Sequence, residues 1–189
     1  MPPHPRIPDK LRHGPFHRLQ AHAEGVTDRM LNGSSYRRLF PAVWVLRAHV
    51  MTDGDWIRAA SLAMPTQARM SHLTRIQALG LDFGPLRPFH FIVAGDLHLE
   101  VPDIFLHRTA VLPPADDVGV TPAAAFIGFC ATARMIDAIK VGDWLLYENH
   151  VTVPEVAELA RRERWRPGAR QVMRVLIAPR RPIAVAQGI

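Results

Sequence analysis

The spacing of apolar and polar residues separates a front half of mixed elements from a back half of helices. In the front half, apolar positions at helical spacing predict helices over 16–23, 27–32, 54–64 and 72–79. Runs rich in β-branched and aromatic residues predict strands over 36–40, 42–46, 89–93, 104–112 and 118–120. Because Pro41 separates the first two runs, they are either two short strands or one bent strand. The N-terminal half is therefore predicted to be α/β (α+β) with short strands.

From Thr121 onward every periodic segment is helical. Thr121-Pro122 is a typical helix start, since threonine can cap the helix and proline fits its first turn. Helices are expected over 122–131, 135–147, 152–162 and 167–177. The C-terminal half is therefore predicted to be α-helical.

These patterns and the shifts in composition predict five segments along the chain. They are a proline-rich flexible arm (1–14), a truncated winged-helix-like segment (15–50), an α/β domain (51–120), a helical domain (121–178) and a frayed tail (179–189). The second of these combines a short helix, an Asn32-Gly33 turn and a basic strand, which is the layout of part of a winged helix.

Composition favours a folded cytoplasmic protein. Hydrophobic residues make up 48 % of the chain, which is enough for a core. There is no run of about 18 apolar residues that would span a membrane, and the N-terminal MPPHPRIPDK has no apolar core of a signal peptide. The single cysteine, Cys130, lies in the apolar run AAAFIGFCATA, so we expect it to be buried and unreactive.

Residue types that carry chemistry do not form a familiar constellation. The ten histidines are His4, His13, His17, His22, His49, His72, His90, His98, His107 and His150. None of them forms an HxxxH pair on an expected helix beside an acid, and the chain has no CxxC pair, so no metal site is expected. The chain also lacks a Walker-type phosphate loop and a dinucleotide fingerprint, so no cofactor is expected.

One group of residues raises the possibility of hydrolysis. Ser71-His72 stands in the same region of the chain as Asp96 and His98. A serine hydrolase needs its nucleophile on a strained turn, and the chain has no GxSxG motif. Ser71 is better explained as the cap of the helix over 72–79. We therefore expect no catalytic residues and predict that the protein acts by binding.

Arginine clustering is the remaining signal. The formal charge is +6, from 23 Lys+Arg against 17 Asp+Glu, and between 161 and 181 eight arginines face one glutamate. This stretch is either a solvated helix face or a docking surface for an acidic protein or nucleic acid. Its candidate binding residues are Arg161, Arg162, Arg164, Trp165, Arg166, Arg170 and Arg174. A second group, Arg29, Arg37 and Arg38, is a candidate DNA-phosphate contact.

Seven short segments follow one another along the chain in an order that resembles that of a known protein family. They are GVTDRML, YRRLFPAVWV, AASLAMP, SHLTRIQALGL, FHFIV, LHRT and LPPADDVGVTPAAAF. Over residues 25–176 this order resembles the actinobacterial AbiE-type antitoxins, and also the N-terminal part of longer actinobacterial proteins that end in an endonuclease-like domain.

The resemblance implies a binding function. Such an antitoxin neutralises a nucleotidyltransferase toxin that acts on RNA, typically tRNA, and more than one antitoxin can serve each toxin. The alternative is a DNA-binding autoregulator of its own operon. Because only 35 residues precede Tyr36, we expect a fragment of the winged helix and weak DNA binding. A third possibility is an enzyme remnant with an unrecognised hydrolytic site, whereas the endonuclease-like tail is not expected.

Overall fold

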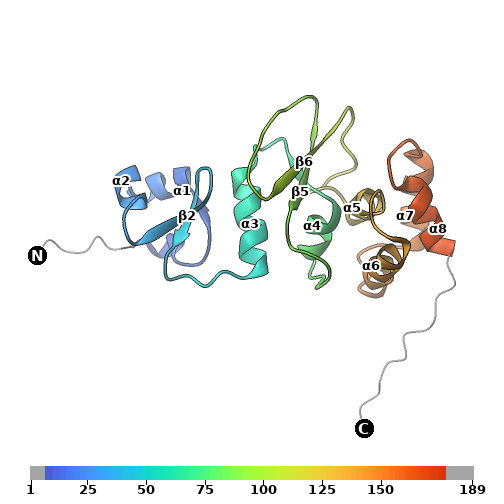
Figure 1. Ribbon diagram of the computed structural model, residues 1–189, viewed down its shortest axis with the longest axis horizontal. Coiled ribbons are helices and arrows are strands. Elements are labelled where there is room, and N and C mark those ends of the chain that lie inside the picture. Colours follow the sequence, from blue (N-terminus) through green and yellow to red (C-terminus); the bar gives the residue numbers. More distant parts are fainter. Residues whose placement is uncertain (1–6, 178–189) are drawn as a thin grey trace, which may run out of the picture. The chain divides into compact units, whose positions relative to one another are not determined.

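The computed structural model describes residues 7–177, and the chain divides into two compact units (Figure 1). The first unit ends at Thr121 and the second begins at Pro122. The first unit combines helices with two three-stranded sheets, whereas the described part of the second contains only helices. The coarse prediction of an α/β front half and a helical back half is therefore confirmed. The expected tail at 179–189 and the first six residues of the expected arm lie outside the described residues.

The N-terminal body of the first unit is built on a small antiparallel sheet. Its elements are η1 (Asp9–Leu11), β1 (Phe16–His17), α1 (Arg18–Ala23), α2 (Asp28–Leu31), β2 (Tyr36–Phe40) and β3 (Val43–Leu46). The strands lie in the order β1-β3-β2, so the first strand pairs with the last. The two runs around Pro41 are therefore separate strands of a hairpin. Leu11 is only 2 % exposed and belongs to this body's core, so this part of the expected arm is folded.

The segment 16–23 differs from the single helix that its apolar spacing predicts. Phe16 instead pairs with Trp44 of β3. His17 then caps α1, because its Nδ1 accepts the Leu19 N–H at 3.2 Å while Gln20 accepts the His17 N–H at 2.8 Å. This reciprocal capping ends the strand and starts the helix within two residues.

The second sheet forms around a buried aromatic face. Its region contains α3 (Asp53–Ala63), β4 (Arg69–Met70), α4 (His72–Gln77), β5 (Phe89–Ala94) and β6 (Ile104–Thr109). The strand order is β4-β5-β6, with β5 and β6 parallel. Phe89 and Phe91 point into a core with Ile57 of α3. Since neighbouring residues of a strand point to opposite faces, His90 and Ile92 lie on the other face.

Two helix caps differ from those expected. Thr52, not Asp53, caps α3: its hydroxyl accepts the Asp55 N–H at 3.1 Å, and Asp55 accepts the Thr52 N–H in return. Ser71 occupies the cap position of α4 but makes no capping hydrogen bond. Its hydroxyl instead contacts Nδ1 of His72 at 2.9 Å.

A buried arginine ties the loop LPPADDVG to α4. The guanidinium of Arg75 donates from Nε to the Val120 carbonyl at 3.1 Å and from Nη2 to Asp116 at 2.7 Å. The other oxygen of Asp116 accepts the N–H groups of Val118 and Gly119, each at 2.8 Å. Residues 118–120 therefore form a turn with isolated bridges rather than the short strand that their sequence predicts.

The second unit is a small helical assembly. Its helices are α5 (Pro122–Phe129), α6 (Met135–Tyr147), α7 (Val153–Arg162) and α8 (Ala169–Ile177), and Figure 1 shows α7 and α8 side by side. Thr152 caps α7 in a capping box with Glu155, and Pro154 fits its first turn. In none of the helices over 7–177 is there an apolar stretch long enough to cross a bilayer.

Candidate binding surfaces

The arginine-rich stretch of the second unit lies on the helix pair α7–α8 and the turn between them. Both helices are amphipathic: Leu159 and Val172 are buried, and the arginines face outward. The turn closes through Gly168, whose backbone lies against the carbonyl of Ile127 in α5. Amphipathic packing therefore turns the cations of both helices toward solvent.

The seven candidate residues of this stretch are not equally available. Arg164, Arg170 and Arg174 are exposed, and within residues 7–177 no acidic side chain pairs with them. Arg161 is paired with Glu158 at 2.6 Å. Arg166 forms a close ion pair with Glu163, and its side chain is only 10 % exposed. Arg166 is thus part of the turn's own structure, while three arginines remain open to a partner.

Trp165 is the apolar element of the same surface. It is 58 % exposed, which is unusual for so large a side chain. The guanidinium of Arg166 lies 4.2 Å from the centroid of its indole ring. This cation–π contact orients the indole and leaves much of it facing solvent. We define Arg164, Trp165, Arg170 and Arg174 as the arginine–tryptophan surface.

The three arginines of the N-terminal body also differ in availability. Arg29 of α2 and Arg38 of β2 are exposed. Arg38 donates to the Phe40 carbonyl at 3.2 Å and lies over Trp44 at 5.5 Å, so its position on the hairpin is defined. Arg37 is half-buried, and its guanidinium donates to the His49 carbonyl at 3.1 Å. Arg29 and Arg38 are thus the better phosphate ligands of the three.

The structure brings together three histidines that no pattern in the sequence groups. His72 stacks on His107 with ring centroids 3.8 Å apart and planes 10° apart. His90 contacts His107 through ring nitrogens at 3.0 Å. Phe105, which is 52 % exposed, lies 4.6 Å from the His107 ring. The register explains part of the grouping, because His90 and Ile92 of β5 lie opposite Phe105 and His107 of β6 in the parallel pair, whereas His72 comes from the first turn of α4.

This histidine cluster is uncharged at neutral pH. Burial, together with repulsion from His107 and His90, lowers the pKa of His72 to about 2. Burial and repulsion from His90 lower the pKa of His107 to about 4, and burial lowers the pKa of His90. The stacked rings leave no common point for a metal ion, and no group of three ligating side chains within residues 7–177 is arranged to hold one.

Acid is therefore expected to destabilise the first unit. Between the unfolded pKa of 6.5 and the folded value near 2, the unfolded chain binds a proton at His72 that the folded chain does not. Stability is then full above pH 6.5 and falls as the pH is lowered, by up to about 1.4 kcal/mol per pH unit for this residue. Urea unfolding at neutral pH and near pH 5 measures the loss.

His72→Asn should reduce this pH dependence. Asparagine tolerates the positive φ of 51° found at position 72 and does not titrate in this range. His98→Asn is the control, because His98 lies on an exposed loop and its only polar partners within residues 7–177 are Asp96 and Arg108. An unchanged pH dependence in His72→Asn, with a flatter one in His98→Asn, would contradict the assignment.

The hydrolytic arrangement considered from the sequence is not assembled in the described residues. Asp96 and His98 pair with each other at 3.2 Å and with Arg108, and neither contacts His72. Ser71 is buried, so its hydroxyl does not face solvent. Cys130 is also buried, and burial raises the pKa of its thiol to about 12. Ser71 and Cys130 are therefore packed inside the first and second units, whereas Asp96 and His98 lie on the surface beside Arg108.

Comparison of the sequence with protein families and curated proteins identifies no relative of this chain. No protein-family model matches the chain, and no curated protein is significantly similar to it.

Proposed function

We propose that this chain is an antitoxin that binds a nucleotidyltransferase toxin and neutralises it through the arginine–tryptophan surface. The observation that supports the proposal is the exposure of Trp165 in a stretch where no acidic side chain of residues 7–177 pairs with Arg164, Arg170 or Arg174. An exposed tryptophan beside available guanidinium groups combines the two residue types most enriched at binding hot spots. The toxin's part in the proposal rests on the resemblance to AbiE-type antitoxins.

The chemistry of the proposed partner fits this surface. A nucleotidyltransferase holds catalytic metal ions with carboxylates, so its cleft presents acidic groups that arginines can pair with bidentately. Trp165 would supply the apolar contact that excludes water from those pairs. The competing consideration is that the cleft mouth receives RNA and is therefore basic, in which case the apolar helices of the first unit would dock instead.

Charge reversal on the surface should abolish toxin binding. In the variant Arg164→Glu, Trp165→Ala, Arg170→Glu we expect at least a hundredfold weaker capture of the toxin, since reversal at a buried contact costs several kcal/mol. Arg166 stays unchanged because it stabilises the turn through Glu163. The measurements are a pull-down with the product of an adjacent nucleotidyltransferase gene as the proposed toxin, and rescue of growth at matched expression.

The matched control is Arg58→Glu, which reverses one exposed charge on α3 of the first unit. Circular dichroism of both variants verifies that they fold. If the folded triple variant neutralises the toxin at an equal dose, the contact lies on another surface.

The second candidate function is DNA binding by the N-terminal body, as an autoregulator of its operon. It is supported by the element order of residues 9–46: a helical turn, a strand, two helices and a hairpin whose last strand pairs with the first. This is the order of a small winged helix, with α2 in the place of the recognition helix. Arg29 lies on α2 and Arg38 on the hairpin, where both can reach phosphates.

DNA binding by this body should be weak and strongly salt-dependent. Because α2 has only four residues, it offers few base contacts, so phosphates are expected to dominate the affinity. In gel shifts at two salt concentrations, Arg29→Ala with Arg38→Ala should lower the salt slope by about two. Arg134→Ala, an exposed arginine of the second unit, is the control. Tight promoter binding that survives the double substitution would contradict this assignment.

A further inference from the structure

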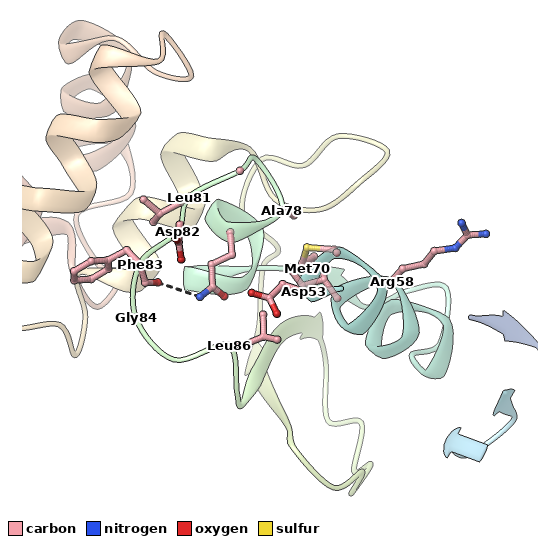
Figure 2. Close-up of a pocket in the computed structure, with 13 residues that line it drawn as sticks. Asp53, Arg58, Met70, Ala78, Leu81, Asp82, Phe83, Gly84 and Leu86 are labelled. Atoms are coloured by element: carbon pink, nitrogen blue, oxygen red, sulfur yellow. Dashed lines mark hydrogen bonds between the residues drawn. The ribbon is translucent and has the colours of Figure 1, made fainter. Parts of the chain in front are cut away.

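One edge of the second sheet is covered by neighbouring segments of the chain. The strand order is β4-β5-β6, so β4 and β6 form the two edges. Beside β4, the Met70 carbonyl accepts the N–H of Val120 at 2.9 Å. Met70 also lines a hollow together with Leu81 and Leu86, and Figure 2 shows the loop that carries these two residues. The β4 edge therefore already has a pairing partner within the chain.

The opposite edge, β6, is open. Thr109 turns its carbonyl toward β5, where it accepts the Gly95 N–H at 3.0 Å. Because the backbone groups of successive residues alternate in direction along a strand, the N–H and C=O groups of Leu106 and Arg108 point away from β5. Neither N–H donates to a carbonyl of another segment within residues 7–177. In this part of the chain β6 thus presents free backbone groups, to which another strand can add.

β6 also lacks the features by which edge strands usually avoid pairing. Its six residues contain no proline, and they pair with β5 in a continuous register without a bulge. At neutral pH its only charged side chain is Arg108, and Asp96 accepts a hydrogen bond from that guanidinium at 3.1 Å. Phe105 is 52 % exposed. A regular edge strand that exposes a large aromatic ring favours pairing with a further strand.

A second copy of β6 fits this edge in the antiparallel orientation. The outward-pointing residues then exchange hydrogen bonds, and a two-fold axis at Leu106 sets Leu106 against its copy and Ile104 against Arg108. Phe105 of each chain lies opposite His107 of the other, at a position where the Cα atoms are about 4.5 Å apart. On the other face of the sheet, Ile104 and Leu106, which are only partly buried, meet their copies and extend the apolar core. Both faces of β6 are therefore self-complementary.

Charge selects this register over its neighbours. With the axis at Leu106, the two copies of Arg108 lie four residues apart along the pair, or about 13 Å. An axis at His107 would bring the two arginines to within two residues of each other. An axis at Phe105 would set Arg108 against Pro102, which precedes the strand and has no N–H to donate. The register centred on Leu106 keeps the like charges apart and uses most of the strand.

We propose that the protein forms a weak homodimer by antiparallel pairing of β6 with β6 of a second copy. The pairing joins two three-stranded sheets into one continuous sheet. Backbone hydrogen bonds at Leu106 and Arg108 set the register, and the contacts of Phe105 with His107 of the second copy add ring packing. Two such short strands bury less than the roughly 1,200 Å² of stable specific interfaces, so the dissociation constant is expected to be about 0.1–1 mM.

The first test is amide hydrogen exchange of the full chain, followed by NMR from about 10 µM to about 1 mM protein. The amides of Leu106 and Arg108 should exchange about two- to fivefold more slowly at the highest concentration, because exchange then requires dissociation of the dimer. The amides of Phe105 and His107 should not change, since they point toward β5 and are protected in the monomer as well. This alternation distinguishes edge pairing from association through a face of the sheet.

Phe105→Lys should weaken dimerisation at least about tenfold in sedimentation equilibrium, because it places a charge on the edge and removes the ring contact. Val50→Lys is the matched control: Val50 is 85 % exposed, lies outside the second sheet, and should leave the dimer as in the parent. Circular dichroism verifies that both variants fold.

Disulfide cross-linking tests the register. A mixture of Phe105→Cys and His107→Cys chains, oxidised with copper phenanthroline, should form a disulfide between the two variants, because their Cα atoms are about 4.5 Å apart in the dimer. Either variant alone should cross-link far less, since identical positions are two residues out of register and more than about 7 Å apart.

Three results would overturn the proposal. They are the absence of any dimer up to about 1 mM, a dimer that Phe105→Lys leaves unchanged, and cross-linking of identical variants as efficient as that of the mixture. The first would leave the edge to a strand of a different protein, and the other two would place the contact between copies elsewhere. None of these results depends on the toxin or on DNA.

Discussion

Gly168→Ala is expected to unfold the second unit. A Cβ atom at this position would lie 2.0 Å from the Ile127 carbonyl oxygen and 2.8 Å from the Ala131 nitrogen. Both are backbone atoms at the end of α5, so no side-chain rotation relieves the clash. The φ of +91° adds strain of about 1–2 kcal/mol for any residue with a Cβ. We expect a total loss above about 4 kcal/mol, measured by urea unfolding with far-UV circular dichroism.

Gly25→Ala separates the clash from the strain. Gly25 has a φ of +78°, and a Cβ there would meet no heavy atom within 4 Å. This control should lose only the strain of about 1–2 kcal/mol. Equal losses in the two variants would show that the contact of the α7–α8 turn with α5 is looser than described. Unfolding of Gly168→Ala should also remove the proposed toxin binding, because the arginine–tryptophan surface lies on this turn and on α8.

The elements that the sequence predicts well are those whose stabilising contacts are local. The helix over 135–147 and the capped helix from Thr152 were predicted with nearly their observed bounds, since apolar periodicity and capping act within one or two turns. β1 was missed because Phe16 belongs to a strand only through its pairing with Trp44, 28 positions later. Tertiary pairing of this kind overrides a helical pattern of six or seven residues.

The candidate sites also divide into features that depend on local sequence, which can be predicted, and features that depend on tertiary contacts, which cannot. The sequence locates the arginines but not their partners, so Arg166 and Arg37 were grouped with exposed residues although both are engaged within the fold. For Arg166 a signal was present, because Glu163 precedes it at the i,i+3 spacing that favours pairing. The histidine cluster had no such signal. His90 and His107 come together through the parallel register of β5 with β6, and His72 joins them from the first turn of α4; no local pattern specifies either contact.

Arg75→Met is expected to cost about 3 kcal/mol and to detach the loop LPPADDVG. Arg75 is only 5 % exposed. Within residues 7–177, its guanidinium is the only hydrogen-bond donor to Asp116 Oδ2 and the only one to the Val120 carbonyl. Methionine fills a similar volume but leaves the carbonyl unsatisfied and the carboxylate unpaired. Removing one partner of a buried pair costs about 3–5 kcal/mol. The lower end applies here because the Asp116 side chain is 42 % exposed and can be solvated.

A double-mutant cycle with Asp116→Asn isolates the ion pair from the rest of the contact. Asparagine keeps the oxygen that accepts the Val118 and Gly119 N–H groups but turns a donor toward the guanidinium. Asp116→Asn alone should therefore destabilise the first unit, and much less so when Arg75 is already methionine. A coupling energy above about 1 kcal/mol in urea unfolding is the expected result. Additive losses would mean that Arg75 holds the loop through the Val120 carbonyl alone. The pair would then contribute no more than an exposed ion pair does.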